Sequence, residues 1–268
     1  MMLDTKDFIE RVRALYAANP GYISSIPSWK LEGFLLQSRT CKLVDGQDTC
    51  LYAVDGDRLV FYWSNNTKRF MLPDDELRSL SFLVLHEDFY RLIEGQLAGY
   101  DVSPAYTLFY DFSHEETKET HSENPRYYLA DFDFAREQEY EDLAQLVRDT
   151  DSHYRLTGDK VKQWTESPAF DPTLWLWVRE RGTDRPVGVG VSNYNTGMKE
   201  TDLDWFYVLP SHQGNGIGRM LVKETIARAK DRSAVIRLGG VADEFYMKCG
   251  FQRKDRWFVV RRLPTDNT

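Results

Sequence analysis

Hydrophobic and polar residues follow two different periods along this 268-residue chain. In its second half, short apolar runs such as "TLWLWVRE", "PVGVGVSNYN" and "TDLDWFYVL" have the composition of β-strands. Residues 136–151 instead place Tyr140, Leu143 and Val147 at helical spacing. Together with the remaining segments, these patterns predict the order β-α-α-β-β-β-α-β-α-β from residue 127 onward. That order is typical of an α/β fold with a mixed central sheet flanked by helices.

The first half shows a different mixture of patterns. A helical segment near the N-terminus precedes a hairpin in which "TCLYAV" and "RLVFYW" flank the turn "DGD". A buried strand, "LSFLVL", a helix from about Glu87 and an aromatic strand, "YTLFYDF", follow. Residues 113–126 are polar and cannot bury themselves. We therefore expect an N-terminal α+β domain over 1–112, a linker over 113–126 and a second domain over 127–268.

Charge and cysteine content narrow the classes of function. Acidic side chains outnumber basic ones by 42 to 34, for a formal net charge of -8, which argues against a nucleic-acid partner and permits a cationic substrate. Cys41, Cys50 and Cys249 are widely spaced, and no histidine cluster completes a metal site. No apolar run approaches the roughly 20 residues that span a bilayer. We expect a cytoplasmic protein with no metal and no membrane partner.

A loop with three glycines separates a predicted strand from a predicted helix. In "FYVLPSHQGNGIGRM", Gly214, Gly216 and Gly218 alternate, so Arg219 stands where a dinucleotide fingerprint requires its third glycine. No Gly-Lys-Ser/Thr follows, which excludes a P-loop. Glycine inside a helix costs about 1 kcal/mol relative to alanine. Two glycines in a first helical turn therefore indicate backbone N–H groups that approach an anion. The alternative is a turn in which the glycines only relieve strain.

Two segments carry a family resemblance. Gln213, Gly216 and Gly218 match Q/R-x-x-G-x-G/A, so the loop resembles the acetyl-CoA motif of the GCN5-related N-acetyltransferase (GNAT) family. Residues 245–251, "FYMKCGF", resemble the second hallmark of that family, F-Y-x-K-x-G-F. The two segments stand in the family's order, about 30 residues apart. The resemblance covers the chain from about Tyr127 onward and implies a GNAT-type mixed sheet.

The resemblance also implies a role for each matching residue. Tyr246 is the expected general acid, which protonates the leaving thiolate. Asp204 or Asp202, two apart on one strand with Glu200 in the same alternation, is the expected base; a solvated strand end is the alternative. The strand through Phe206, Tyr207 and Val208 is expected to pair with the pantetheine arm of acetyl-CoA. Its pyrophosphate is expected on the backbone amides of Gln213, Gly214, Asn215, Gly216, Ile217, Gly218 and Arg219.

The N-terminal half lacks the glycine motif but echoes the second hallmark. "HEDFYRLIEGQLAGYDVSPAYTLFYDF" is similar to "ADEFYMKCGFQRKDRWFVVRRL", with a spacing that differs by five residues. We interpret this similarity as a weak internal repeat, and hence as a degenerate second GNAT-like domain. Chance similarity of two helix-strand units is an equal alternative.

From these features we expect an acetyl-CoA-dependent N-acetyltransferase (EC 2.3.1 type). It would transfer an acetyl group to a primary amine of a small molecule or peptide by direct attack on the thioester. A non-catalytic acyl-CoA-binding or regulatory module is the alternative, because Gly239 stands where the family often has an asparagine. A protein-protein scaffold is a third interpretation. The sequence leaves open the acceptor, a homodimer, and the choice among Asp202, Asp204 and water as the base.

Overall fold

The computed structural model describes residues 4–38, 40–44, 48–113, 124–240 and 243–263. The chain forms two compact units. The first contains residues 1–108, 239–243 and 253–268, and the second contains residues 109–238 and 244–252. The units thus interleave along the chain, whereas the domains expected from the sequence follow one another. Residues 114–123 of the expected linker lie outside the described residues.

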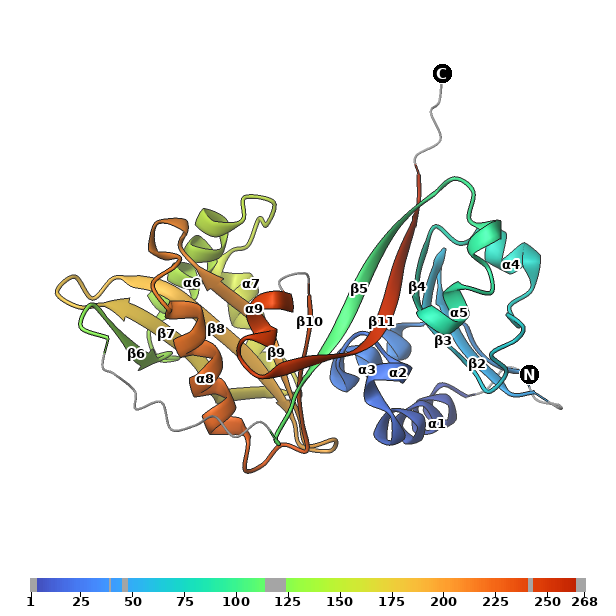
Figure 1. Ribbon diagram of the computed structural model, residues 1–268, viewed down its shortest axis with the longest axis horizontal. Coiled ribbons are helices and arrows are strands. Elements are labelled where there is room, and N and C mark those ends of the chain that lie inside the picture. Colours follow the sequence, from blue (N-terminus) through green and yellow to red (C-terminus); the bar gives the residue numbers. More distant parts are fainter. Residues whose placement is uncertain (1–3, 39, 45–47, 114–123, 241–242, 264–268) are drawn as a thin grey trace, which may run out of the picture. The chain divides into compact units, whose positions relative to one another are not determined.

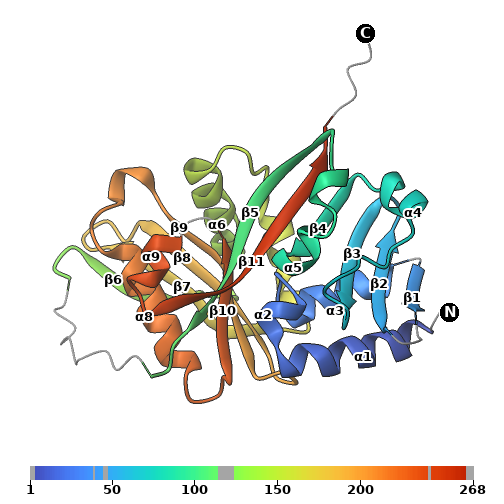
Figure 2. The ribbon, with the colours of Figure 1, turned by 45° about the vertical axis from the view of Figure 1, so that its right-hand side comes forward.

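The first unit begins with helices and continues as a mixed sheet. Its strands follow the order β1-β2-β3-β4-β11, where β11 is Phe251–Arg262 near the C-terminus; β3 and β4 are parallel and the other neighbours antiparallel. Helices α1 and α3 cover one face, where Phe8 packs against Phe61 of β3 (Figure 2). The elements are α1 (Thr5–Ala18), α2 (Pro20–Ile23), α3 (Ser28–Gln37), β1 (Thr40–Val44), β2 (Cys50–Asp55), β3 (Arg58–Ser64), α4 (Asp74–Ser79), β4 (Phe82–His86), α5 (Glu87–Tyr90), η1 (Glu94–Gln96) and β5 (Tyr100–Tyr110).

Two details of this half differ from the expectation. The helix expected from about Glu87 ends at Tyr90 and is followed by a turn and the short 3-10 helix η1, before Gly99, with a φ of 87°, leads into β5. The following strand already begins at Tyr100. The predicted hairpin is confirmed, and Gly56, with a φ of 59°, occupies its turn.

The second unit has the α/β order predicted from residue 127 onward. Its strands follow the order β10-β9-β8-β7-β6, with only β9 and β10 parallel among the pairs described. Helix α8 packs on one face of β7, β8 and β9, and α6 packs on the other (Figure 1). The predicted mixed sheet flanked by helices is confirmed. The elements are β6 (Tyr127–Asp131), α6 (Glu137–Thr150), α7 (Gly158–Gln163), η2 (Trp164–Glu166), β7 (Phe170–Glu180), β8 (Pro186–Asn195), β9 (Glu200–Val208), η3 (Pro210–His212), α8 (Ile217–Ala229), β10 (Val235–Gly240), α9 (Asp243–Met247) and β11 (Phe251–Arg262).

The two units repeat one arrangement of strands. In each, an antiparallel strand acquires a short parallel neighbour: β4 beside β3, and β10 beside β9. In each, the register against the preceding strand then shifts by one residue, at Val60 of β3 and at Asp204 of β9. The N-terminal half is therefore GNAT-like in its strands, as the internal repeat predicted.

A buried polar contact fastens α6 to β7. Glu139 is 2% exposed and accepts hydrogen bonds from Nε1 of Trp177 and from the guanidinium of Arg179, each 2.5 Å long. Trp177 is fully buried, so its N–H has no access to water. Phe132 stacks on the same indole in the aromatic core of the unit. The contact therefore fixes the position of α6 on the sheet.

Replacing Glu139 with alanine should lower the free energy of unfolding by about 3–5 kcal/mol, because it removes the carboxylate from the largely buried guanidinium of Arg179 and leaves the buried indole N–H of Trp177 without an acceptor. Urea unfolding followed by circular dichroism measures the change. Glu137→Ala is the matched control. Glu137 lies on the exposed surface of α6 and pairs with Lys162 of α7, so its loss should change the free energy of unfolding little. Equal effects of the two variants would contradict this account.

Candidate functional site

Strand β9 separates from its neighbour β10 partway along its length. The parallel pairing joins Glu200 to Val235 and ends with Asp202 opposite Arg237. Along its other edge, β9 stays paired with β8 as far as Val208. Among the described residues, β9 beyond Asp202 therefore has one edge without a strand partner.

Alternate residues direct their backbone groups to this open edge. Leu209 donates its N–H to the carbonyl of Val187, which is part of β8. Because successive residues of a strand point their N–H and C=O to opposite edges, those of Phe206 and Val208 face away from β8. Two of the three positions predicted to meet pantetheine thus lie on the open edge, whereas Tyr207 directs its backbone toward β8.

A β-bulge redirects the acidic side chains of β9. The register against β8 shifts between Leu203 and Trp205, so Asp204 is the extra residue. The simple alternation from which we expected Asp202 and Asp204 to share a face is broken at this point. Asn193 of β8 still links the two, because it lies opposite Asp202 and its Nδ2 donates to Oδ2 of Asp204 over 3.3 Å. The structure thus brings both predicted bases to one asparagine.

The acidic residues of β9 differ in burial, and a buried arginine lies beside two of them. Arg237 of β10 is fully buried, lies opposite Asp202 and forms an ion pair with Glu200 over 4.0 Å. Glu200 and Asp202 are buried as well, whereas Asp204 is half-buried. A buried cation stabilises carboxylates that are held beside it. Asp204 is therefore the acid of this group with the greatest access to an incoming substrate.

An aromatic cluster adjoins the acids on β9. Trp164 stacks on Trp205 with ring centroids 4.7 Å apart, and Tyr154 lies 5.1 Å from Trp205 in an edge-on arrangement. Tyr154, 43% exposed, also contacts Tyr207, and burial raises the pKa of the Tyr207 phenol above its usual value. We did not predict this cluster, because its members come from separate segments of the chain.

The glycine loop leaves a series of backbone N–H groups available. Gly214 and Gly216 have φ values of 78° and 79°, a conformation that other residues rarely adopt. We had expected Gly216 inside the first turn of α8. It is instead the N-cap residue that precedes that turn. Among the described residues, no acceptor is found for the backbone N–H groups from Gly214 to Arg219. Such groups at the start of a 13-residue helix are suited to an anion.

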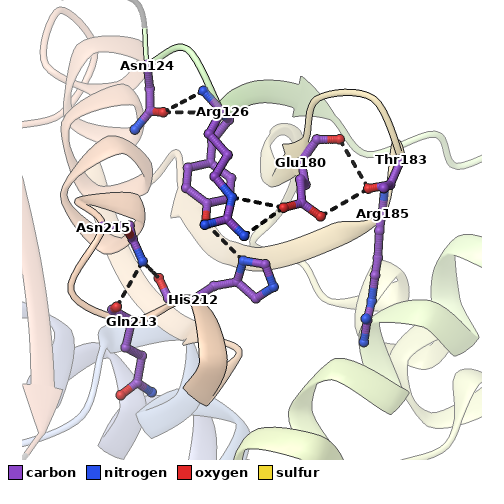
Figure 3. A network of polar contacts seen from close by, with 9 residues as sticks. Asn124, Arg126, Glu180, Thr183, Arg185, His212, Gln213 and Asn215 are labelled. Atoms are coloured by element: carbon purple, nitrogen blue, oxygen red, sulfur yellow. Dashed lines mark hydrogen bonds and ion pairs between the residues drawn. The ribbon is translucent and has the colours of Figure 1, made fainter.

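Side chains within and beside the loop hold it in place (Figure 3). Nδ1 of His212, a buried residue, lies 3.0 Å from the hydroxyl of Tyr127 on β6. Asn215 donates to the carbonyl oxygens of His212 and Gln213, each over 3.0 Å. The side chain of Gln213, expected to donate to the pyrophosphate, donates to the carbonyl of Val208 over 3.1 Å. The loop is therefore tied to the end of β9 and to the opposite edge strand of the unit.

Two glycines bring α8 close to its neighbours. A Cβ at Gly188 on β8 would lie 2.6 Å from Cγ2 of Ile217, the first residue of the helix. A Cβ at Gly218 would lie 3.0 Å from the ring of Phe245. Because Gly188 has no side chain, the first turn of α8 can pack closely against β8. Because Gly218 has none, the glycine motif can pack closely against Phe245 of the second motif. Only the Gly218 position was singled out by the sequence.

Tyr246 follows Phe245 on α9. Its ring is half-buried and lies 5.9 Å from that of Phe251. Burial, reinforced by the neighbouring Cys249, raises the pKa of the Tyr246 phenol above its usual value near 10. The phenol therefore keeps its proton at neutral pH, as a proton donor must.

A split mixed sheet followed by a glycine loop and a helix defines an α/β protein of the acyltransferase class. The model of the "Acetyltransferase (GNAT) family" matches residues 106–251, and the chain belongs to this family. Membership supports acetyl transfer from acetyl-CoA as the general activity. No curated protein matches the chain.

Solved structures share the fold along the whole chain. A GNAT from Sphaerobacter thermophilus, 13% identical, aligns over 100% of this chain and 96% of its own with a TM-score of 0.67. An acetyltransferase of the GNAT family from Colwellia psychrerythraea, 12% identical, aligns over 98% of each chain with a TM-score of 0.61. A tandem GNAT protein from the clavulanic acid biosynthesis pathway, 14% identical, aligns over 99% of each chain with a TM-score of 0.63. The fold is thus that of GNAT proteins, one of which is a tandem GNAT protein.

Cys41, Cys50 and Cys249 are buried free thiols. No group of three or more His, Cys, Asp or Glu in the described ranges could hold a metal ion. None of the described helices is long and apolar enough to cross a membrane.

Gly188→Ala should push Ile217 away from β8 and disturb the loop that precedes it, because the new methyl would overlap Cγ2. We expect a loss of about 1–3 kcal/mol in the free energy of unfolding and weaker binding of acetyl-CoA, measured by denaturation and calorimetry. In the double variant Gly188→Ala/Ile217→Ala the overlap is gone, so binding should recover relative to Gly188→Ala. Unchanged binding in Gly188→Ala would show that the helix start does not position the loop.

Proposed function

We propose that the protein is an acetyl-CoA-dependent N-acetyltransferase whose reaction occurs beside the open edge of β9. The observation that carries this proposal is the succession of that open edge and the glycine loop. Backbone groups of Phe206 and Val208 offer a strand-like partner to the amides of pantetheine, and the N–H groups from Gly214 to Arg219 offer donors to the pyrophosphate. Arg219 is exposed and adds a positive charge at the same end.

The proposed reaction is direct transfer. The amine nitrogen attacks the thioester carbonyl, and a proton of the amine passes to Asp204, directly or through water, or to Asp202. The N–C bond forms, the C–S bond breaks, and the sulfur takes its proton from the Tyr246 hydroxyl. Backbone N–H groups on the open edge polarise the carbonyl oxygen as negative charge develops on it.

The acceptor is proposed to be a primary amine of a small molecule or peptide. An amine is largely cationic at neutral pH. The half-buried Asp204 offers a negative charge to such a cation, and Trp205, which follows it on β9, offers an aromatic face together with Tyr154. Acetyl-CoA is the proposed co-substrate, with no metal required by the reaction.

A non-catalytic acyl-CoA-binding module is the second candidate. The side chain that many relatives place at position 239 is absent here, because a Cβ at Gly239 would lie 3.3 Å from the carbonyl oxygen of Ser25. A contact to pantetheine from that position is therefore missing. This candidate predicts binding of acetyl-CoA without turnover.

Replacing Tyr246 with phenylalanine should lower kcat by about a hundredfold or more, because the thiolate would leave without its acid. Release of free CoA thiol with a panel of amines measures turnover, and the acetyl-CoA-induced rise in Tm measures binding, which should be retained. Tyr90→Phe is the matched control, since Tyr90 occupies the equivalent Phe-Tyr segment of the first unit and stacks on Phe258.

Three results would each exclude a different part of this proposal. Full turnover by the Tyr246→Phe variant would remove the acid role of that tyrosine. A rise in Tm without thiol release from any amine would favour the binding module. The absence of any rise in Tm with acetyl-CoA at about millimolar concentration would exclude both candidates.

A further inference from the structure

The first unit contains a cavity at the place where its own two parallel strands separate. Strands β3 and β4 pair only at Arg58 opposite Phe82 and at Leu59 opposite Leu83. Directly beyond that point lies a cavity of about 260 Å³, lined by Val60 and Phe61 of β3, Val84 of β4 and Trp257 of β11, among others. Because the bulge of β3 is at Val60, the cavity occupies the position in this unit that corresponds to the open edge of β9 in the other.

The walls of this cavity are apolar and it reaches the surface. Ile23, Leu59, Phe61 and Val84 contribute aliphatic and aromatic surface, and Phe34 of α3 both lines the cavity and is 45% exposed. A soluble protein rarely leaves a phenylalanine ring this exposed beside an apolar hollow unless something packs there. The interior is therefore suited to a chain or ring of carbon atoms.

The charged groups at one end favour an anion. Arg58 and Asp55 both line the cavity. A second guanidinium, that of Arg261, lies opposite Phe82 on β11, and Arg58 and Arg261 are centred 4.8 Å and 5.6 Å from the Phe82 ring. Arg261 is not among the residues that line the cavity, but its guanidinium and that of Arg58 both lie against the Phe82 ring, which does line it, so two positive charges stand beside that ring. Guanidinium groups match carboxylate geometry well.

This unit has no equivalent of the glycine loop. The segment from residue 65 to 73 contains no glycine, and its basic residues Lys68 and Arg69 are exposed. The helix that follows, α4, is six residues long and carries Asp74, Asp75 and Glu76 in its first turn. Acidic side chains at a helix start repel a diphosphate. A whole CoA molecule is therefore not the ligand that this unit is built to hold.

We propose that the cavity of the first unit is a binding site for a small amphipathic anion, with an apolar chain or ring and one carboxylate or sulfonate. The apolar part lies between Phe34, Val84 and Trp257, and the anionic group lies at the end marked by Arg58 and Phe82. This site is independent of acetyl transfer and does not use the glycine loop.

Calorimetric titration of the full chain with decanoate tests the proposal. We expect saturable binding of about one decanoate per chain, about fivefold weaker binding of decanol, which lacks the charge, and no detectable binding of decylamine. Arg58→Gln should weaken the binding of decanoate about fivefold and leave that of decanol unchanged. Val84→Phe should weaken both about tenfold by occupying the cavity.

Control variants distinguish a loss of the binding site from a loss of the folded structure. Val102→Phe makes the same change at a half-buried valine of the first unit that does not line the cavity, and it should bind decanoate like the unaltered chain. Phe34→Ala, on the exposed rim, should weaken binding even if Val84→Phe does not fold. The proposal is overturned by no saturable binding up to about 1 mM decanoate, by decylamine binding as tightly as decanoate, or by unaltered affinity in Phe34→Ala.

Discussion

The backbone edge that β9 leaves open beyond Asp202 is the feature on which the rest of the site depends. Peptide groups at a sheet edge need a hydrogen-bonding partner, from water or from another chain-like molecule. The pairing with β10 ends at the buried Arg237, which forms an ion pair with Glu200 and lies opposite Asp202 of β9 where the strands separate. The bulge at Asp204 then brings a carboxylate to the start of the open edge, and the loop after Val208 brings N–H groups to its far end. The proposed base, the strand edge proposed to pair with pantetheine and the proposed pyrophosphate site all lie along this one separation of strands.

The first unit contains a similar separation of two parallel strands, for which we propose a different ligand. Its strands β3 and β4 separate after Leu59 and its bulge follows at Val60, so the geometry of the sheet is shared with the second unit. The two units differ in the segment that follows the separation of the strands. The first unit has a glycine-free segment and a short acidic helix, whereas the second has the glycine loop and α8. The two units thus share an arrangement of strands but differ in the connecting segment, and we propose different ligands for them.

Much of this architecture was predictable from the sequence, and the misses share a cause. The strands of the second half, the hairpin turn at Gly56 and the motif around Gly216 follow from local pattern and turn chemistry. The bulge at Asp204 does not, because it depends on the register against β8. The same holds for Gly188, whose role is defined by Ile217, distant in sequence, and for the assignment of residues 253–268 to the first unit. Local sequence does not encode which distant segment will pack against it.

Hydrogen-deuterium exchange with and without acetyl-CoA tests the central claim most directly, because it reports on the backbone groups themselves. The account predicts that acetyl-CoA slows exchange in peptides that cover residues 203–219, with little change in β1–β3 of the first unit. Unchanged exchange over 203–219 at a concentration of acetyl-CoA that raises Tm would contradict it, since binding would then occur away from the open edge of β9 and the glycine loop.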